Sequence, residues 1–234
     1  MLWVGKERPE QSFRGFFAMF GKARARALRF VASDMWQAYL DVIAEMASQA
    51  INVIDRFHIV AKVNKAVDEA HAGEARELVR QGYEPVLKHA RGCFLKHPEN
   101  LTGKQCLKLV DVLRYDLRSV RAYLLKHSLR LFWSYTSPRL AGWFLDRWCT
   151  RAMRSRLEPM KKVARTLRSH RELILNWLRA KKEISAAAVE GLTANAKLAL
   201  RKARGFRTYE VLETALYHEM GHLPEPACVT HRFC

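Results

Sequence analysis

Two carboxylates, Asp34 and Glu190, occupy positions at which acids commonly take part in chemistry. Asp34 lies just beyond the largely apolar run Leu28 to Ala32, which indicates a β-strand that leads to a carboxylate. Glu190 stands in Val189-Glu190-Gly191-Leu192, at the start of a long basic segment. Carboxylates can hold two divalent ions about 3.5–4 Å apart, which activate the attacking oxygen and stabilise the leaving oxygen of a phosphodiester. Because hard ions such as Mg²⁺ prefer oxygen ligands, the two acids point to metal-assisted phosphoryl transfer.

Asp55 is a further acid with the same placement, because it follows a second apolar run, Ile51 to Ile54. Open α/β sheets bind ligands beyond the carboxyl ends of their strands, so Asp34 and Asp55 are well placed for a metal if their strands are neighbours. An Asp after a strand is also often the N-cap of the next helix, and a helix is expected to begin near His58. The sequence leaves both interpretations open for both aspartates.

The helix expected around Glu190 favours a function for this residue. Val189, Leu192 and Ala196 form an apolar stripe at helical spacing, and Glu190 falls on a different face. The basic residues that share this face with Glu190 are Lys197, Arg201 and Arg204. An acid at the start of such a row is the arrangement expected of a metal ligand beside a phosphate backbone. An exposed helical glutamate is the plainer alternative.

The overall charge indicates a polyanionic partner. The 234 residues include 41 Lys and Arg against 23 Asp and Glu, for a formal net charge of +18, and nucleic acid is the commonest partner of so basic a chain. An anionic membrane is the alternative, but no segment offers the roughly 20 apolar residues of a membrane span, and no signal peptide is evident. The five cysteines form no CxxC pair, which favours free thiols in a reducing cytoplasm.

Basic residues also recur at helical spacing in the middle of the chain. The two clusters are Arg147, Arg151 and Arg154, and then Lys161, Arg165 and Arg168. A solvated surface would explain either cluster alone. Together with the overall charge, phosphate contact is the better interpretation, and such contacts would position DNA without reading its sequence.

The first part of the chain alternates strand and helix, which favours an α/β layer with mostly parallel strands. We expect strands at 2–4, 28–32 and 51–54, and helices at about 9–21, 36–47 and from 58 onward. From about 73 to 182 no strand is evident, and helices are expected to break at Gly82, Pro85, Pro98, Pro138 and Pro159. Two more helices are expected at about 185–203 and up to 220. The helical stretch contains Trp133, Trp143, Trp148 and Trp177, and most of these four should fill its core.

A short motif near the end of the chain suggests a different chemistry. His218-Glu219-Met220-Gly221-His222 matches the H-E-x-x-H pattern of zinc metalloproteases, in which two imidazoles on one helix face bind zinc and the glutamate is a general base. Gly221 suggests that the helix ends there, and Cys228 occupies the position of the third histidine of the extended motif. A solvated helix end is the preferred interpretation, with a zinc hydrolase as a remote alternative.

Several stretches, taken in order, resemble the DDE-type transposases of bacterial insertion sequences, specifically the ISL-three family. The most specific are Ser33-Asp34-Met35-Trp36, Asp55-Arg56-Phe57-His58 and Val189-Glu190-Gly191-Leu192. The start, Leu2-Trp3-Val4-Gly5-Lys6, and the end, Thr230-His231-Arg232-Phe233-Cys234, also fit. The similarity therefore covers nearly the whole chain.

The resemblance implies an α/β fold that is mostly helical overall, with an incomplete RNase H-like core and a large all-α insertion. Residues 1–72 would belong to the core, 73–182 to the insertion, 183–222 to the C-terminal core helices and 223–234 to a tail. It implies Asp34 and Glu190 as the second and third acids of the catalytic triad, binding Mg²⁺ or Mn²⁺, with Asp55 and His58 in support. The implied enzyme cleaves and transfers DNA strands in the bacterial cytoplasm, at the nucleoid, as a homo-oligomer or with a full-length transposase.

One departure from the family bears on catalysis. The first acid of the triad lies upstream of the Leu-Trp-Val-Gly element, which begins here at Leu2, and no Asp precedes Asp34. The zinc-binding and helix-turn-helix regions of the family are not among these 234 residues either. We therefore expect the C-terminal part of a transposase. A catalytically inactive remnant that binds DNA or a partner protein is the alternative to an active enzyme.

Overall fold

The computed structural model of the chain describes residues 3–5, 10–83, 86–180, 187–202, 206 and 208–220. Along the last two helices it describes the backbone alone at residues 187–190, 192, 193, 199, 202, 219 and 220. The chain divides into two compact units and passes between them more than once. The first unit comprises Met1–Arg29, Trp36–Ala50 and Ser185–Cys234, and the second comprises Phe30–Met35 and Ile51–Ile184.

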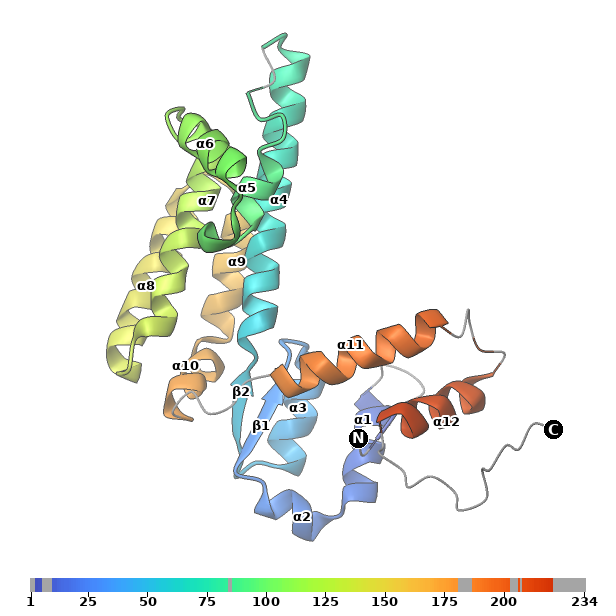
Figure 1. Cartoon of the computed structure of the whole chain (residues 1–234). Helices are drawn as coiled ribbons and strands as arrows, with labels where there is room; N and C mark the ends of the chain where they lie inside the picture. Colours follow the sequence, from blue (N-terminus) through green and yellow to red (C-terminus); the bar gives the residue numbers. More distant parts are fainter. Residues whose placement is uncertain are drawn as a thin grey trace, which may run out of the picture. The chain divides into compact units, whose positions relative to one another are not determined.

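The first unit is built from helices. They are α1 (Glu10–Phe20), α2 (Lys22–Ala27), α3 (Gln37–Met46), α11 (Ala187–Lys202) and α12 (Tyr209–Met220) (Figure 1). Aromatic residues join α1 to α3, since the rings of Phe13 and Tyr39 have centroids 4.8 Å apart. Gly21 separates α1 from α2 with a φ of 87°, which glycine adopts without a steric penalty. The helices expected around 9–21, 36–47, 185–203 and up to 220 are thereby confirmed.

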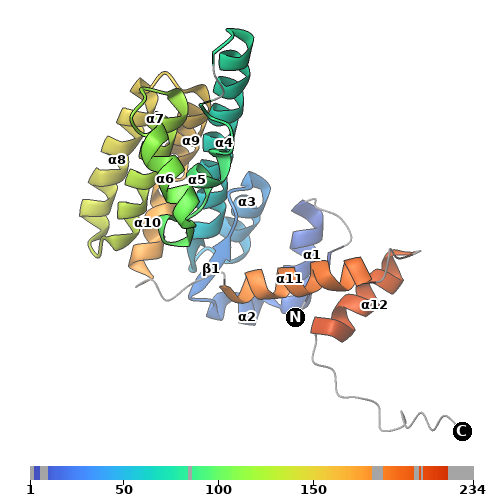
Figure 2. The same ribbon diagram turned by 45° about the horizontal axis from the view of Figure 1, so that its top comes forward.

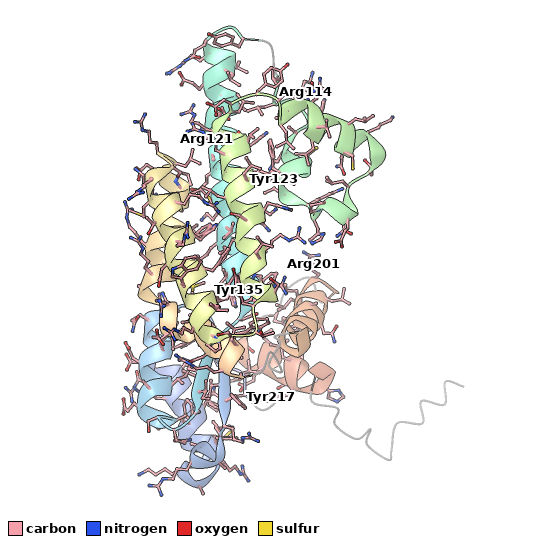
Figure 3. The ribbon with its side chains drawn as sticks, turned by 90° about the vertical axis from the view of Figure 1, so that its left-hand side faces the viewer. Arg114, Arg121, Tyr123, Tyr135, Arg201 and Tyr217 are labelled. Atoms are coloured by element: carbon pink, nitrogen blue, oxygen red, sulfur yellow. The ribbon has the colours of Figure 1, made fainter. Side chains whose placement is uncertain are left out.

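The strand expected at residues 2–4 is not formed at Trp3 and Val4, so this prediction was wrong. The backbone of Val4 instead pairs with tyrosine hydroxyl groups of α12. The Val4 N–H donates to the Tyr217 hydroxyl at 3.1 Å, and the Val4 carbonyl accepts from the Tyr209 hydroxyl at 3.2 Å. Tyr217 is labelled in Figure 3. Backbone groups need hydrogen-bond partners, and here side chains distant in the sequence take the place of a neighbouring strand.

The second unit contains a two-stranded parallel sheet. Its strands β1 (Phe30–Ser33) and β2 (Ile51–Ile54) pair in register from Phe30 with Ile51 to Ser33 with Ile54. Helix α10 (Arg171–Arg179) packs against β2, and the side-chain amide of Asn176 donates to the Asn52 carbonyl at 2.7 Å. The parallel strands expected from the sequence are confirmed, although β1 begins only at Phe30. Two strands do not make an RNase H-like core, which stays a prediction.

Helices form the rest of the described part of the second unit. Their order is α4 (Arg56–Arg80), α5 (Arg91–Leu95), η1 (Pro98–Asn100), α6 (Gly103–Val112), α7 (Arg118–Leu129), η2 (Arg130–Ser134), α8 (Pro138–Arg154) and α9 (Glu158–Ser169). Figures 1 and 2 show α4, α7, α8 and α9 running beside one another. Three of these elements have a proline in their first turn, because a first helical turn tolerates the missing N–H. Pro98 and Pro138 are the first residues of η1 and α8, and Pro159 is the second residue of α9. The expected breaks at these prolines are confirmed.

Tryptophans fill much of the core of this unit, with one exception. Trp148 is 2% exposed, and the Trp133 and Trp177 rings meet edge to face with centroids 4.9 Å apart. Trp143 is 59% exposed, so three of the four tryptophans are buried and the prediction that most of them fill the core is confirmed. The helix turns this position toward solvent while it turns Leu145 and Trp148 inward.

A buried carboxylate joins two helices of the second unit. Glu74 of α4 is 6% exposed. It accepts hydrogen bonds from the backbone N–H groups of Arg118 and Ser119, both at 2.7 Å, and from the Ser119 hydroxyl at 2.6 Å. The N–H groups at the start of α7 have no intrahelical partner, and Glu74 supplies one.

Helix α4 runs without a break through residue 73, where the sequence predicts a domain boundary. The predicted boundaries at 72, 182 and 222 stay predictions.

Candidate active-site edge and nucleic-acid surface

Asp34 and Asp55 leave the sheet at the same edge. Ser33 is paired with Ile54, and the next residues along the two strands are Asp34 and Asp55. The Asp55 N–H donates to the Ser33 carbonyl at 3.1 Å, so the register continues to this point. Neighbouring strands lie about 4.8 Å apart, which brings the two aspartates side by side at the carboxyl ends of β1 and β2. This is the edge at which open α/β sheets bind their ligands.

Asp55 is the N-cap of α4, one of the two roles that the sequence allows. One carboxylate oxygen, Oδ1, accepts from the Phe57 N–H at 2.9 Å. The other, Oδ2, lies 3.8 Å from Nε2 of His58, whose side chain is 44% exposed. Asp55 therefore fixes the start of α4 at the sheet edge and holds His58 beside it. A metal contact of Asp55 stays a prediction.

Asp34 does not cap the helix that follows it. Helix α3 begins at Gln37, and its N-cap position is Trp36, which makes no side-chain capping bond. Asp34 is half-buried at the end of β1. The N-cap interpretation therefore does not hold for Asp34, and a metal contact of Asp34 stays a prediction.

Glu190 lies in α11, in the first unit, and its side chain is outside the described residues. Lys197 and Arg201 of the same helix are exposed, and Figure 3 labels Arg201, whereas Arg204 lies outside the described residues. Within the described part of the chain no group of three or more His, Cys, Asp and Glu side chains could hold a metal ion. The metal contacts of Asp34 and Glu190 stay predictions.

The H-E-x-x-H motif falls at the end of α12. His218 lies in the last turn of the helix and is exposed, and the described residues end at Met220. Gly221 and His222 lie outside them. The zinc-hydrolase alternative therefore stays a prediction from the sequence.

The basic residues of α8 form an exposed surface with an aromatic side chain among them. Arg147, Arg151 and Arg154 are exposed, and the Arg147 guanidinium lies over the Trp143 ring, 4.6 Å from its centroid. The only acidic residue in the sequence of α8, Asp146, is held by Arg171 through two hydrogen bonds of 2.9 and 3.0 Å. Because that carboxylate is occupied, the arginines of α8 keep their charge available for an anion.

The basic row of α9 joins this surface at one point. Arg168 donates from Nη2 to the Thr150 hydroxyl of α8 at 3.1 Å, and Arg165 is exposed. Lys161 differs, because its ammonium group pairs with Glu158 at 2.6 Å. We define the α8 surface as Trp143, Arg147, Arg151 and Arg154, with Arg168 beside it. Sequence reasoning missed Trp143, although its position four residues before Arg147 places both on one helix face.

No helix of the described residues is long and apolar enough to cross a membrane.

Comparisons with known proteins identify the family. A profile of the ISL-three (ISL3) DDE family, described as transposase, matches residues 1–216. The chain is 28% identical over 212 residues to the transposase for insertion sequence element IS1001 of Bordetella parapertussis, covering 90% of this chain and 52% of that protein. It is 30% identical over 247 residues to the transposase for insertion sequence element IS1557 of Mycobacterium tuberculosis, covering 96% and 55%.

The chain thus spans about half the length of these curated relatives. No solved structure matches it significantly. The family profile extends over both Asp34 and Glu190, and the matched segment includes the sheet edge and the α8 surface. The chain belongs to the ISL-three family of DDE transposases.

Proposed function

We propose that this chain carries part of the catalytic core and part of the DNA-holding surface of a transposase that cleaves and joins DNA strands. The observation that carries the proposal is the position of Asp34, at the carboxyl edge of a parallel strand pair within the segment matched by the transposase family. Ligands of α/β sheets bind at such an edge. The RNase H-like core and the predicted domain boundaries belong to this proposal.

The metal ligands that this chain supplies to the proposed site are Asp34 and Glu190. Oxygen ligands of this kind suit Mg²⁺ or Mn²⁺. When bound, such ions make an attacking oxygen more nucleophilic and stabilise the leaving oxygen of a phosphodiester. Asp55 fixes the first turn of α4 at this edge and places His58 beside it. The α8 surface holds phosphates of the DNA backbone.

Iron-directed cleavage of the protein tests the proposed metal ligands. Fe²⁺ occupies Mg²⁺ sites and, with ascorbate and peroxide, produces radicals that cut the nearby backbone. We expect cuts near residues 34 and 190 that excess Mg²⁺ suppresses. Asp34→Asn should abolish the cut near residue 34. Asp41→Asn, which changes an exposed aspartate of α3, should leave both cuts intact. The same cuts in the Asp34→Asn protein would remove Asp34 from the site.

Removal of charge from the α8 surface tests the DNA contact. Each phosphate contact contributes about 0.9 to the slope of log affinity against log salt for duplex DNA. The triple variant Arg147→Gln, Arg151→Gln, Arg154→Gln should therefore lower the slope by roughly 2 to 3. A control variant removes the same charge elsewhere, through Arg76→Gln, Arg80→Gln and Arg114→Gln. Fluorescence anisotropy with a labelled duplex between 50 and 300 mM salt measures the salt slope of each variant. Equal slopes for the α8 variant and the control variant would contradict the proposal.

The inactive-remnant alternative makes a different prediction for the same two experiments. A chain that only binds DNA would keep the steep salt dependence, because the α8 surface is intact. It would show no iron-directed cuts near residue 34, because its acids would not hold a metal. The pair of measurements therefore separates an enzyme lineage with a working metal site from a DNA-binding module.

A further inference from the structure

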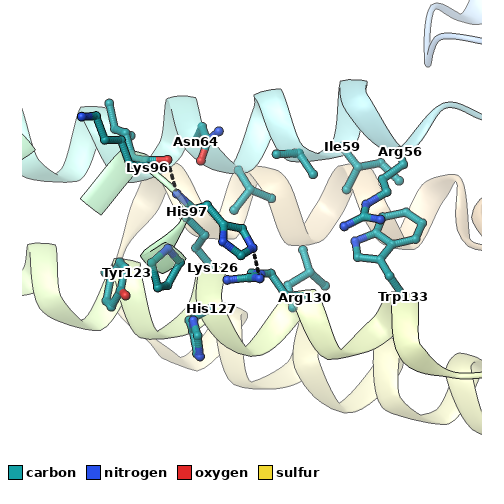
Figure 4. A pocket seen from close by; sticks show the side chains of 15 residues that line it. Arg56, Ile59, Asn64, Lys96, His97, Tyr123, Lys126, His127, Arg130 and Trp133 are labelled. Atoms are coloured by element: carbon teal, nitrogen blue, oxygen red, sulfur yellow. Dashed lines mark hydrogen bonds between the residues drawn. The ribbon is translucent and has the colours of Figure 1, made fainter. Parts of the chain in front are cut away.

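The second unit contains a cavity of about 250 Å³ that the proposed function does not use. It lies between α4, α7, η2 and the segment that follows α5, so all of its walls belong to one unit. Figure 4 shows Arg130 reaching His97 and Arg56 lying beside Trp133 at one end of the cavity. Its volume is just below the roughly 300 Å³ at which pockets for drug-sized ligands begin. A single nucleotide or a smaller molecule is therefore the largest ligand to consider.

The cavity is lined by cationic side chains and, among the described residues, by no carboxylate. Its cations are Arg56, Lys96, Lys126 and Arg130. The Lys126 ammonium donates to the carbonyl groups of Phe94 and Leu95 at 2.8 and 2.7 Å, which are neutral partners. Burial, together with the charge of Arg130, lowers the pKa of Lys126 to about 8. Burial and Arg130 also lower the pKa of Arg56. Bringing these charges together without an acid is unfavourable, and an anion would relieve the cost.

The nearest acid does not take that role. The Glu99 carboxylate lies 3.4 Å from Nδ1 of His97, but its side chain is 84% exposed and is not part of the cavity wall. Arg130 contacts Nε2 of the same histidine. His97 therefore holds the Arg130 guanidinium at the cavity, while the negative charge of Glu99 stays in solvent.

The other wall of the cavity is apolar, with one unpaired polar atom. Ile59, Val63 and Trp133 are buried, and the Arg56 guanidinium lies 5.0 Å from the centroid of the Trp133 ring. Oδ1 of Asn64 is buried and accepts no hydrogen bond from the described residues. A buried acceptor without a donor is unfavourable, so a bound ligand with an N–H group would stabilise this site.

We propose that this cavity binds a nucleoside phosphate, with the phosphate at Arg130 and Lys126, the base against the apolar wall, and a base N–H donating to Asn64. A phosphate supplies the negative charge that the cations lack. A base supplies both a flat apolar surface and the N–H group. The nucleotide can be free or part of a DNA strand, and both sources share this chemistry. The inference does not require that the chain cleave DNA.

Calorimetric titration of the whole chain with dAMP, without divalent metal, tests the proposal. We expect Arg130→Gln to weaken dAMP binding at least 10-fold. Arg121→Gln, which changes an exposed arginine of α7 outside the cavity, should change it less than 2-fold. Asn64→Leu should weaken dAMP at least 5-fold and leave inorganic phosphate unaffected, because phosphate does not need the Asn64 acceptor. Circular dichroism establishes that each variant is folded. Asn64→Asp adds a negative charge to the cavity with little change in volume, so it should also weaken the binding of dAMP.

Two further titrations distinguish the sources of the nucleotide. A 5′-phosphorylated single-stranded oligonucleotide that binds at least 10-fold more tightly than dAMP, and that loses this advantage in Arg130→Gln, identifies a nucleotide of a DNA strand. Equal or tighter binding of dAMP identifies a free nucleotide. No binding of dAMP at 10 mM, or equal loss in Arg130→Gln and Arg121→Gln, would overturn the proposal. Equal binding of phosphate and dAMP, unaffected by Asn64→Leu, would overturn the assignment of the base. None of these results depends on the metal site at Asp34.

Discussion

Trp148→Ala is expected to destabilise the protein by about 3–5 kcal/mol, the cost of truncating a buried aromatic side chain. Trp148 is 2% exposed, and its indole N–H donates to the Leu125 carbonyl at 2.9 Å. The substitution would leave both a cavity between α7 and α8 and a buried carbonyl group without its donor. Denaturant unfolding followed by circular dichroism measures the change in the free energy of unfolding.

Trp143→Ala is the matched control on the same helix, five residues earlier in the sequence. Its side chain is 59% exposed, so the stability should change by less than about 0.5 kcal/mol. The effect on DNA affinity should be the reverse, with Trp143→Ala weakening DNA binding more than Trp148→Ala does. The loss of the Trp143 ring removes the surface against which Arg147 lies and a face on which a base can stack, worth about 1–3 kcal/mol in binding. A variant Trp143→Ala that loses stability but keeps its DNA affinity would contradict both assignments.

Glu74→Ala is expected to cost about 3 kcal/mol of stability, since hydrogen bonds to charged groups contribute about 1.5–3 kcal/mol each and are not additive. The substitution leaves the N–H groups of Arg118 and Ser119 and the Ser119 hydroxyl without an acceptor. It also removes a negative charge from the N-terminus of α7, where the helix dipole favours one. Thermal and denaturant unfolding both report the loss.

Two other substitutions make this test specific. Glu74→Gln keeps one acceptor oxygen and should fall between the wild type and Glu74→Ala. Glu69→Ala removes an exposed glutamate from the same helix and should change stability by less than about 0.5 kcal/mol. Similar losses for Glu69→Ala and Glu74→Ala would show that α4 responds to the loss of any acid, and that the bonds between α4 and α7 are not the cause.

Local chemistry makes much of this fold predictable. Pro98, Pro138 and Pro159 lie in the first turns of helical elements because a proline removes an N–H that a first turn does not use. Asp55 can be recognised as an N-cap because it lies between an apolar run and a helical repeat. These features depend on neighbours within a few residues, so the sequence contains all the information needed to infer them. The family resemblance, carried by short motifs around Asp34, Asp55 and Glu190, is predictable for the same reason.

Contacts between distant residues explain where the predictions were incomplete or wrong. The residues around Val4 read as a strand, yet the partners of its backbone are Tyr209 and Tyr217, more than 200 positions away. The cavity at Arg130 leaves no sequence signal, because its cations come from three separate segments that meet only in the folded second unit.

The sequence by itself determined most of the helices and the two paired strands, which acids follow those strands, and the excess of positive charge. Only the tertiary structure decided that Trp148 is buried and Trp143 exposed, and that Asp34 and Asp55 leave the sheet side by side. Periodicity gives the face of a helix on which a residue lies. It does not say which neighbouring element covers that face, because packing against distant segments sets burial and strand register.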